Sequence, residues 1–203
     1  WQEVSFIDFD ADGDPDLYLG SVSARDGNVD ALLVNDGFGR FRQREGIQLP
    51  PPAYTPDHAV NNAKAADFNG DGFEDLFFFE ISRPFGGSSV LRLWLNTGEG
   101  GFNDASAAWG LPSQCSAEVV EPLYVRDFNR DGWPDVLLPP QCSNLGGAGL
   151  LMNTGTTFDF LAFSSIETWL EHDVGTPIDV QGDGALDLFF GEHGGNPILV
   201  QIL

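Results

Sequence analysis

The sequence predicts an all-β protein built from four tandem units, and three observations support this prediction. A nine-residue acidic loop with the pattern D-x-[DNQ]-x-D-G-x-x-D begins at residues 8, 67, 127 and 179. Short apolar and aromatic runs flank each loop, bounded by glycine, proline, asparagine or aspartate, as is typical of strands. Only 164–172, which carries a helix-capping pattern, suggests a helix, because no segment sustains the 3.6-residue period over a helix's usual length.

The spacing of the motifs divides the chain 1–203 into one domain of four units. A second pattern, N-x-G, follows each of the first three loops, with its asparagine at Asn35, Asn96 and Asn153. Four antiparallel strands per unit, with the acidic loop between the first and second strands, favour the blades of a β-propeller. A two-sheet sandwich also has short strands but predicts no motif in register. The units lie at about 1–59, 60–119, 120–173 and 174–203.

The fourth unit is shorter than the other three. Its sequence accounts for three strands, the last of them at 198–201, and leaves a four-stranded blade with an unpaired edge. We therefore expect the four units to be an incomplete part of a larger propeller.

The acidic composition excludes some function classes. The formal charge is −22, from 31 acidic and 9 basic residues, so phosphate backbones would be repelled and no nucleic acid partner is expected. The longest apolar run, Leu76–Phe79, is far too short for a membrane span. A solubilising acidic surface is one interpretation, yet 15 of the 31 acids fall within the 36 residues of the four loops. This concentration indicates a cation site in each loop.

The residue types in the loops suit calcium, which takes about six to eight oxygen ligands from a flexible cage. Alternate residues of a tight loop can point inward together, so positions 1, 3 and 5 supply side-chain oxygens and position 7 a backbone carbonyl. The acid at position 9 closes the cage, and glycine at position 6 permits the sharp turn. Position 12, where an EF-hand needs glutamate, is apolar in all four loops.

We expect three to four Ca²⁺ ions, one in each loop. Gln181 replaces an acid or asparagine at position 3 and makes the fourth loop the weakest site. The predicted ligands are Asp8, Asp10, Asp12, Asp14 and Asp16; Asp67, Asn69, Asp71, Phe73 and Asp75; Asp127, Asn129, Asp131, Trp133 and Asp135; and Asp179, Gln181, Asp183, Ala185 and Asp187.

The loops and the N-x-G turns, with the later pairs Gly46-Ile47 and Gly110-Leu111, resemble FG-GAP/VCBS repeats. Such repeats occur in integrin α-subunit propellers and in many secreted bacterial proteins. The resemblance covers nearly the whole chain and implies that each loop binds Ca²⁺ between the first two strands of a blade. It also implies further blades, from the same or a neighbouring chain. The sequence departs from the pattern at Gln181, at Thr157 and in the short fourth unit.

The two cysteines bear on the compartment. Cys115 and Cys142 flank the hairpin of the third loop, both at the end opposite the predicted metal. We expect a disulfide between them, which implies an oxidising environment, although two unpaired thiols in loops remain an alternative. Together with the resemblance, this predicts an extracellular, cell-surface or periplasmic protein.

Two function classes stay open from the sequence. One is a non-enzymatic interaction or structural module, which would bind a protein or glycan ligand at the segments opposite the acidic loops. The other is a carbohydrate-active propeller, either a lectin or a polysaccharide lyase. His58, His172 and His193 fall between strands without a nucleophile signature, so no catalytic residue is predicted. The segments opposite the loops are Ser21–Asp30, Pro50–His58, Ser82–Ser89, Pro140–Gly149 and Gly191–Pro197.

Overall fold

The structure is a computed structural model, and all its regular elements in the described residues are β-strands. The predicted all-β class is confirmed. Across the same residues, no helix combines the length and the apolar character that a membrane crossing needs. The predicted helix at 164–172 lies outside the described residues. The described ranges are 3–21, 30–54, 58–82, 89–115, 123–138, 149–163, 176–184, 186–190 and 198–200.

The strands form four antiparallel sheets, and within each sheet the strands neighbour one another in chain order. The first sheet contains β1 (Glu3–Ile7), β2 (Asp16–Gly20), β3 (Ala31–Asn35) and β4 (Phe41–Gln43). The second contains β5 (His58–Ala66), β6 (Asp75–Ser82), β7 (Ser89–Asn96) and β8 (Phe102–Asp104). The third contains β9 (Tyr124–Arg126), β10 (Asp135–Leu138), β11 (Gly149–Asn153) and β12 (Phe158–Ala162). The fourth contains β13 (Thr176–Ile178), β14 (Asp187–Phe190) and β15 (Ile198–Val200).

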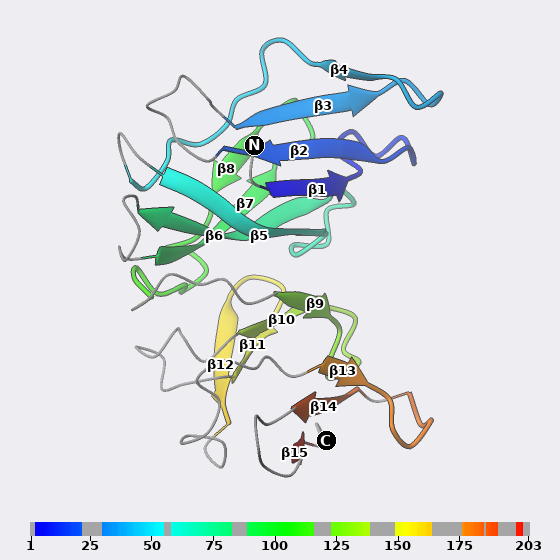
Figure 1. Cartoon of the computed structure of the whole chain (residues 1–203), viewed down its shortest axis with the longest axis vertical. Helices are drawn as coiled ribbons and strands as arrows, with labels where there is room; N and C mark the ends of the chain where they lie inside the picture. The colour runs from blue at the N-terminus through cyan, green and yellow to red at the C-terminus, as the bar shows by residue number, and fades with distance from the viewer. Residues whose placement is uncertain are drawn as a thin grey trace.

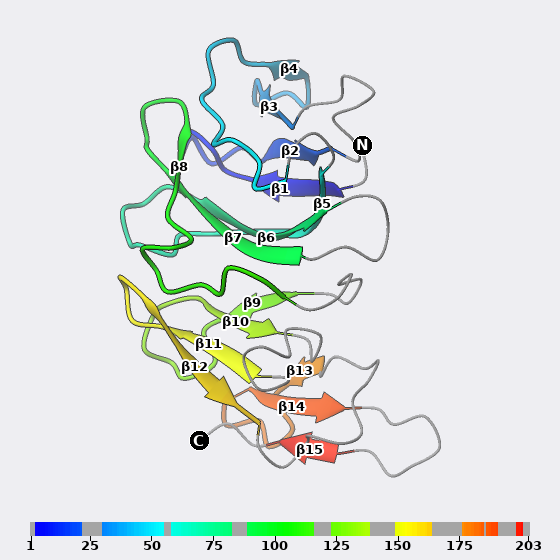
Figure 2. The same ribbon diagram turned by 90° about the vertical axis from the view of Figure 1, so that its left-hand side faces the viewer.

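The four sheets follow one another along the long axis of the molecule, as Figures 1 and 2 both show. In Figure 1 the hairpins that join β1 to β2, β5 to β6, β9 to β10 and β13 to β14 all lie on the right-hand side. Since these hairpins are the acidic loops, the fold gathers all four loops along one edge of the stack.

Neighbouring sheets pack face to face through apolar side chains, and β6 shows why its sequence suits this position. The run Leu76–Phe79 alternates, so that Leu76 and Phe78 join a cluster with Tyr18 of the first sheet. Phe77 and Phe79 face the opposite way and pack in a cluster that includes residues of the third sheet. A short continuous apolar run is the expected pattern for a strand buried on both faces. A third cluster joins the third and fourth sheets around Phe128, Leu137, Leu150 and Leu188.

Backbone contacts also join one sheet to the next. Val60 of β5 donates its N–H to the Ser21 carbonyl at 3.1 Å. Gly20 permits this approach, because a Cβ at that residue would lie 2.6 Å from the Cβ of Val60. The segment after β4 reaches the second sheet, where Phe102 donates its N–H to the Gln48 carbonyl at 2.9 Å. These contacts fix the second sheet against the first.

Candidate metal centre

Each acidic loop begins where the first strand of a sheet ends, and its first aspartate organises the turn. The Asp8 carboxylate accepts the backbone N–H groups of Asp12 and Gly13, each at 3.1 Å. The same two bonds recur at Asp67, Asp127 and Asp179. The glycine at position 6 has a positive φ, between 85° and 93°, in all four loops, which explains why glycine recurs there.

Positions 1, 3 and 5 of the first loop bring three carboxylates together. One oxygen from each of Asp8, Asp10 and Asp12 lies within 4.8 Å of the others. In the second and third loops, position 3 is an asparagine. Asn69 and Asn129 each donate from the side-chain amide to the position-5 acid, Asp71 at 2.9 Å and Asp131 at 2.8 Å. The predicted side-chain ligands at these positions therefore lie beside one another in the first three loops.

The remaining predicted ligands occupy less uniform surroundings. At position 7, Asp14, Phe73 and Trp133 each donate the backbone N–H to the position-5 carboxylate at 2.8–2.9 Å. In the fourth loop, Gln181 and Asp183 are exposed, whereas Ala185 lies outside the described residues. The assignment of these groups as ligands stays a prediction.

The acid at position 9 is buried and has a structural role that the sequence analysis did not assign. Asp75 accepts the backbone N–H of Phe68 at 2.9 Å and that of Asn96 at 2.8 Å. Asp16 and Asp135 make the matching pairs of bonds, and Asp187 accepts the N–H of Val180. All four acids are at most 3% exposed. In the first three loops, this carboxylate thus joins the start of its own loop to a neighbouring strand.

Burial also changes the proton affinity of these acids. It raises the pKa of Asp75 to about 7 and that of Asp135 to about 6, although the backbone donors act in the opposite direction. Nearby loop aspartates raise both pKa values further. Each carboxylate oxygen has a second lone pair, so these hydrogen bonds leave room for a cation. A cation beside Asp75 or Asp135 would favour the ionised form and relieve the repulsion.

The asparagine of the N-x-G turn connects neighbouring repeats, a role that the sequence analysis missed. Asn96 donates its side-chain amide to the Phe9 carbonyl in the first loop at 2.8 Å. Asn153 donates in the same way to the Phe68 carbonyl in the second loop at 2.9 Å. The recurrence of this asparagine at the same place in each repeat was the signal that could have indicated a structural role. Its partners could not be identified from the sequence, because they lie 87 and 85 residues away along the chain.

Further contacts link the loops to one another. Glu74 of the second loop accepts the backbone N–H of Asp8 at 2.7 Å. Arg130 of the third loop lies 3.6 Å from the Asp183 carboxylate in the fourth loop, with both side chains exposed. The ring of Trp133 lies so close to Gly70 that a Cβ on that glycine would sit 2.9 Å from it. Geometry in one loop is therefore coupled to that in the next.

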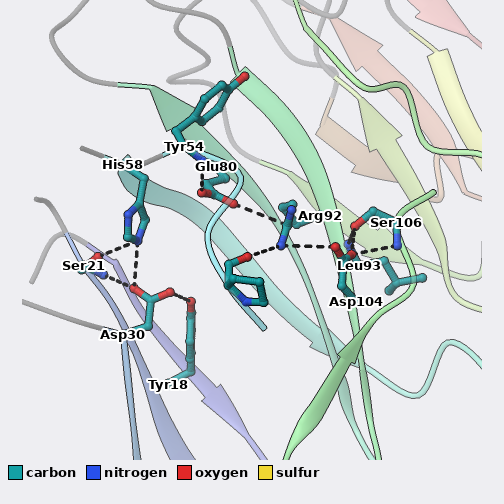
Figure 3. A network of polar contacts seen from close by, with 11 residues as sticks. Tyr18, Ser21, Asp30, Tyr54, His58, Glu80, Arg92, Leu93, Asp104 and Ser106 are labelled. Atoms are coloured by element: carbon teal, nitrogen blue, oxygen red, sulfur yellow. Dashed lines mark hydrogen bonds and ion pairs between the residues drawn. The ribbon is translucent and has the colours of Figure 1, made fainter. Parts of the chain in front are cut away.

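His58 is placed differently from the sequence prediction. It does not fall between strands but begins β5, and it is buried. Nε2 of His58 contacts Ser21 Oγ at 3.1 Å and Asp30 Oδ1 at 3.9 Å, and Tyr18 donates its hydroxyl to Asp30 (Figure 3). A hydrolase triad instead uses the two ring nitrogens for two different partners. His172 and His193 lie outside the described residues.

The His58 cluster has perturbed pKa values. The hydrogen bond with Asp30 raises the pKa of His58, whereas burial lowers it less strongly. Burial alone would raise the pKa of Asp30, but hydrogen bonds with His58, Ser21 and Tyr18 hold it below its usual value. Deeper in the second sheet, Arg92 bridges Glu80 at 3.4 Å and Asp104 at 3.3 Å (Figure 3). The His58 contacts join the second sheet to Ser21 and Asp30, which flank β2 and β3 of the first sheet, whereas the Arg92 ion pairs lie within the second sheet.

Fold and loops together define a protein of tandem antiparallel repeats, each with an aspartate-rich loop between its first two strands; three repeats are four-stranded, and the described part of the fourth has three strands. A family model described as an FG-GAP-like repeat matches the chain twice, over residues 8–78 and 67–138. The two matches together cover more than half of the 203 residues. This chain belongs to the FG-GAP-like repeat family. No curated protein matches the sequence.

Proposed function

We propose that this chain is a calcium-binding part of a β-propeller that acts as a non-enzymatic interaction or structural module outside the cell. The convergence of the Asp8, Asp10 and Asp12 carboxylates within 4.8 Å carries the proposal. Three carboxylates at this spacing repel one another unless protons or a cation neutralise them. A hard divalent cation with oxygen ligands is the natural partner for such a group.

Calcium suits the loops better than magnesium does. Each loop offers up to four side-chain ligands and a backbone carbonyl, whereas magnesium usually retains several waters and needs a near-ideal octahedron. The amide oxygens of Asn69 and Asn129 are neutral ligands of the kind that calcium sites commonly include. The loops are hairpins on a sheet edge, so small adjustments of the turn can fit the larger ion.

The propeller assignment is supported by the sheet stack and the family. Successive four-stranded antiparallel sheets pack face to face, with equivalent loops on one edge, which is how the blades of a propeller are arranged. Further blades from the same or a neighbouring chain would continue this stack. FG-GAP-like repeats are typical of extracellular and cell-surface proteins, which supports the proposed location.

The ligand of the module is proposed to be a protein or a glycan. The segments that the sequence analysis expects to bind it, opposite the acidic loops, are mostly outside the described residues, including 22–29 and 139–148. Loops at one end of a rigid scaffold are the usual setting of a binding surface. The high negative charge favours a partner without extended phosphate.

Elemental analysis after dialysis against calcium tests the metal assignment. We expect three to four calcium ions per chain, and fewer than three would contradict the proposal. The double variant Asp8→Asn/Asp12→Asn should lose one ion. Glu45→Gln removes an exposed acid outside the loops and serves as the matched control, with no ion lost.

Chelation tests whether the metal supports the fold. A ligand at about 100 times its Kd adds roughly 2.7 kcal/mol per site, and a domain's whole stability is about 5–15 kcal/mol. We therefore expect the melting temperature to fall sharply in excess EGTA and to recover when calcium is restored. An unchanged melting temperature would show that the loops do not stabilise the fold through calcium.

A carbohydrate-binding function is the second candidate, and one observation favours it. A groove of about 570 Å³ lies beside the third acidic loop, with the Trp133 and Phe160 rings near the polar side chains of Asp131 and Asp159. Aromatic rings beside polar groups suit stacking and hydrogen bonding to a sugar. A glycan array with and without calcium tests this, with Asp159→Ala expected to abolish any calcium-dependent signal.

A further inference from the structure

The outer face of the first sheet is apolar and exposed. Phe6 pairs with Leu17 and Val4 with Leu19 across the β1–β2 ladder, and Leu17 pairs in turn with Leu33 of β3. Residues paired across antiparallel strands point to the same side of a sheet. These five side chains therefore share one face, on which Val4 is 56% and Phe6 is 64% exposed. We call it the first-sheet face.

The equivalent face of the second sheet is buried against the first sheet. Repeat alignment places Ala63 at the position of Val4, Leu76 at that of Leu17 and Phe78 at that of Leu19. These three residues are 0–1% exposed and pack in one cluster with Tyr18. The repeat positions that form the first-sheet face are therefore those that receive a preceding sheet elsewhere in the chain.

The fourth sheet exposes the complementary half of such a contact. Ile178 is 48%, Val180 51% and Phe189 44% exposed, and we call these three the last-sheet face. Their equivalents in the first sheet are Ile7, Phe9 and Tyr18, which are at most 2% exposed because the second sheet covers them.

A hydrogen-bond donor marks the same interface. Asn96 and Asn153 each donate once within their own repeat, to Glu74 or Pro134, and once to the position-2 carbonyl of the preceding loop. Asn35 makes the first kind of bond, to the Pro15 carbonyl at 3.1 Å. The position-2 residue of the fourth loop is Val180. Val180 is thus the counterpart of Phe9 and Phe68 as a carbonyl acceptor.

We propose that two copies of this chain associate head to tail, with the last-sheet face of one copy on the first-sheet face of the next. Every copy carries both halves of the contact, and equivalent positions of its first and second sheets pack against each other within the chain. In the assembly, Asn35 of one copy donates to the Val180 carbonyl of the other. The interface is heterologous, so each copy keeps one face free to bind another.

Charge sets the conditions for this association. Two chains of formal charge −22 repel each other, and the contact brings the fourth loop of one copy beside the first loop of the next. Near-physiological salt screens the repulsion, and calcium in the loops reduces it. The test is therefore made in calcium and moderate salt.

Sedimentation velocity over a range of concentrations tests the proposal. Wild type should form dimers and larger species as its concentration rises. Phe6→Asp blocks one face and Phe189→Asp the other, so each variant alone should remain monomeric. An equimolar mixture of the two variants should form a dimer and nothing larger. Phe38→Asp changes a side chain that is 87% exposed but lies on neither face, and should behave as wild type.

The outcomes separate the alternatives. A wild-type protein that stays monomeric at every concentration overturns the proposal, as does a mixture that forms no dimer. If Phe6→Asp abolishes association and Phe189→Asp leaves it intact, first-sheet faces pair with each other instead. Melting curves matched to wild type show that the variants fold. Asn35→Asp keeps the oxygen that accepts the Gly37 and Gly39 amides but removes the donor, and should weaken association about 10-fold.

Discussion

Asn96 donates its side-chain amide to the backbone carbonyl of Phe9 across 2.8 Å, and this bond ties the second sheet to the acidic loop of the first. The same side chain accepts the Gly98 N–H at 3.0 Å and so shapes its own turn. One residue therefore sets the local hairpin and the spacing between two predicted metal sites. Asn153 repeats the arrangement one sheet further on.

Replacing Asn96 by alanine should destabilise the protein more than the same change at Asn35. Asn96 is 3% exposed, and its loss leaves the Phe9 carbonyl without this donor. We expect an additional cost of about 1–3 kcal/mol relative to Asn35→Ala, which lacks the bond to a preceding sheet. Urea unfolding of both variants at low protein concentration and saturating calcium measures the difference. Equal losses at the two positions would contradict the cross-sheet role.

Substitutions of Asp16 and Asp10, two acids of the first loop, should distinguish a structural role from a metal-binding role. Asp16 accepts two backbone N–H groups, whereas Asp10 makes a 3.8 Å contact with the partly exposed Arg44, a kind of pair that contributes little. In EGTA we expect Asp16→Asn to lower the free energy of unfolding by about 1–3 kcal/mol, because the new amide cannot accept both bonds. Asp10→Asn should change it little.

Calcium titration of the same two variants completes this comparison. Both should bind one ion more weakly than wild type in isothermal titration calorimetry, since both remove a predicted ligand charge. If Asp10→Asn keeps the wild-type affinity at every site, the charge at position 3 does not contribute to calcium binding. If Asp16→Asn loses stability and keeps full affinity, position 9 is structural alone.

The disulfide between Cys115 and Cys142 stays a prediction, because Cys142 lies outside the described residues. Cys115 is buried, and its backbone pairs with Ser89 at the start of β7. Mass spectrometry of unreduced peptides should show the two cysteines linked. Reduction should then lower stability by about 3 kcal/mol, as expected for a loop of this length. Two unmodified thiols in the native protein would contradict the bond and weaken the case for an oxidising compartment.

Local pattern was sufficient to predict the acidic loops. The aspartate at position 1 accepts the backbone N–H of the glycine at position 6 within the same turn, as Asp67 does with Gly72. A contact this local can be predicted from the sequence alone. The strand Leu76–Phe79 was predictable for the same reason, since its length and apolar character decide its state. The burial of both faces of this strand could not be predicted in the same way, because it depends on the sheets that pack on either side.

Contacts between repeats were beyond the reach of local pattern. The Asn96–Phe9 bond joins residues 87 positions apart, and no spacing rule within one unit points to it. The hydrogen-bonding role of Asp16 was missed because its predicted ligand role already explained an acid at that position. His58 was misplaced because β5 changes register between Asn61 and Lys64, where Asn62 has a φ of 55°. This irregularity breaks the alternation that marks a strand.

His58 should make stability depend on pH. Its pKa is raised above 6.5, first by the hydrogen bond with Asp30 and further by the charges of Asp30 and Glu80, while burial and Arg92 oppose the shift. A raised pKa in the folded state means that the folded protein holds this proton more tightly than the unfolded chain does. The stabilisation is full below pH about 6.5, the unfolded value, and is lost as the pH rises through the folded pKa.

We therefore expect wild type to lose more stability than His58→Gln does when the pH is raised above 6.5 at saturating calcium. Glutamine keeps a donor that can reach Ser21 or Asp30 but does not titrate, so the other acids contribute equally to both proteins. Urea unfolding at several pH values measures the two slopes, and their difference isolates His58. Parallel slopes would mean that the His58–Asp30 contact does not raise the proton affinity of the folded state. A steeper loss of stability in the glutamine variant would mean that folding lowers the pKa of His58 and that the folded protein favours the neutral imidazole.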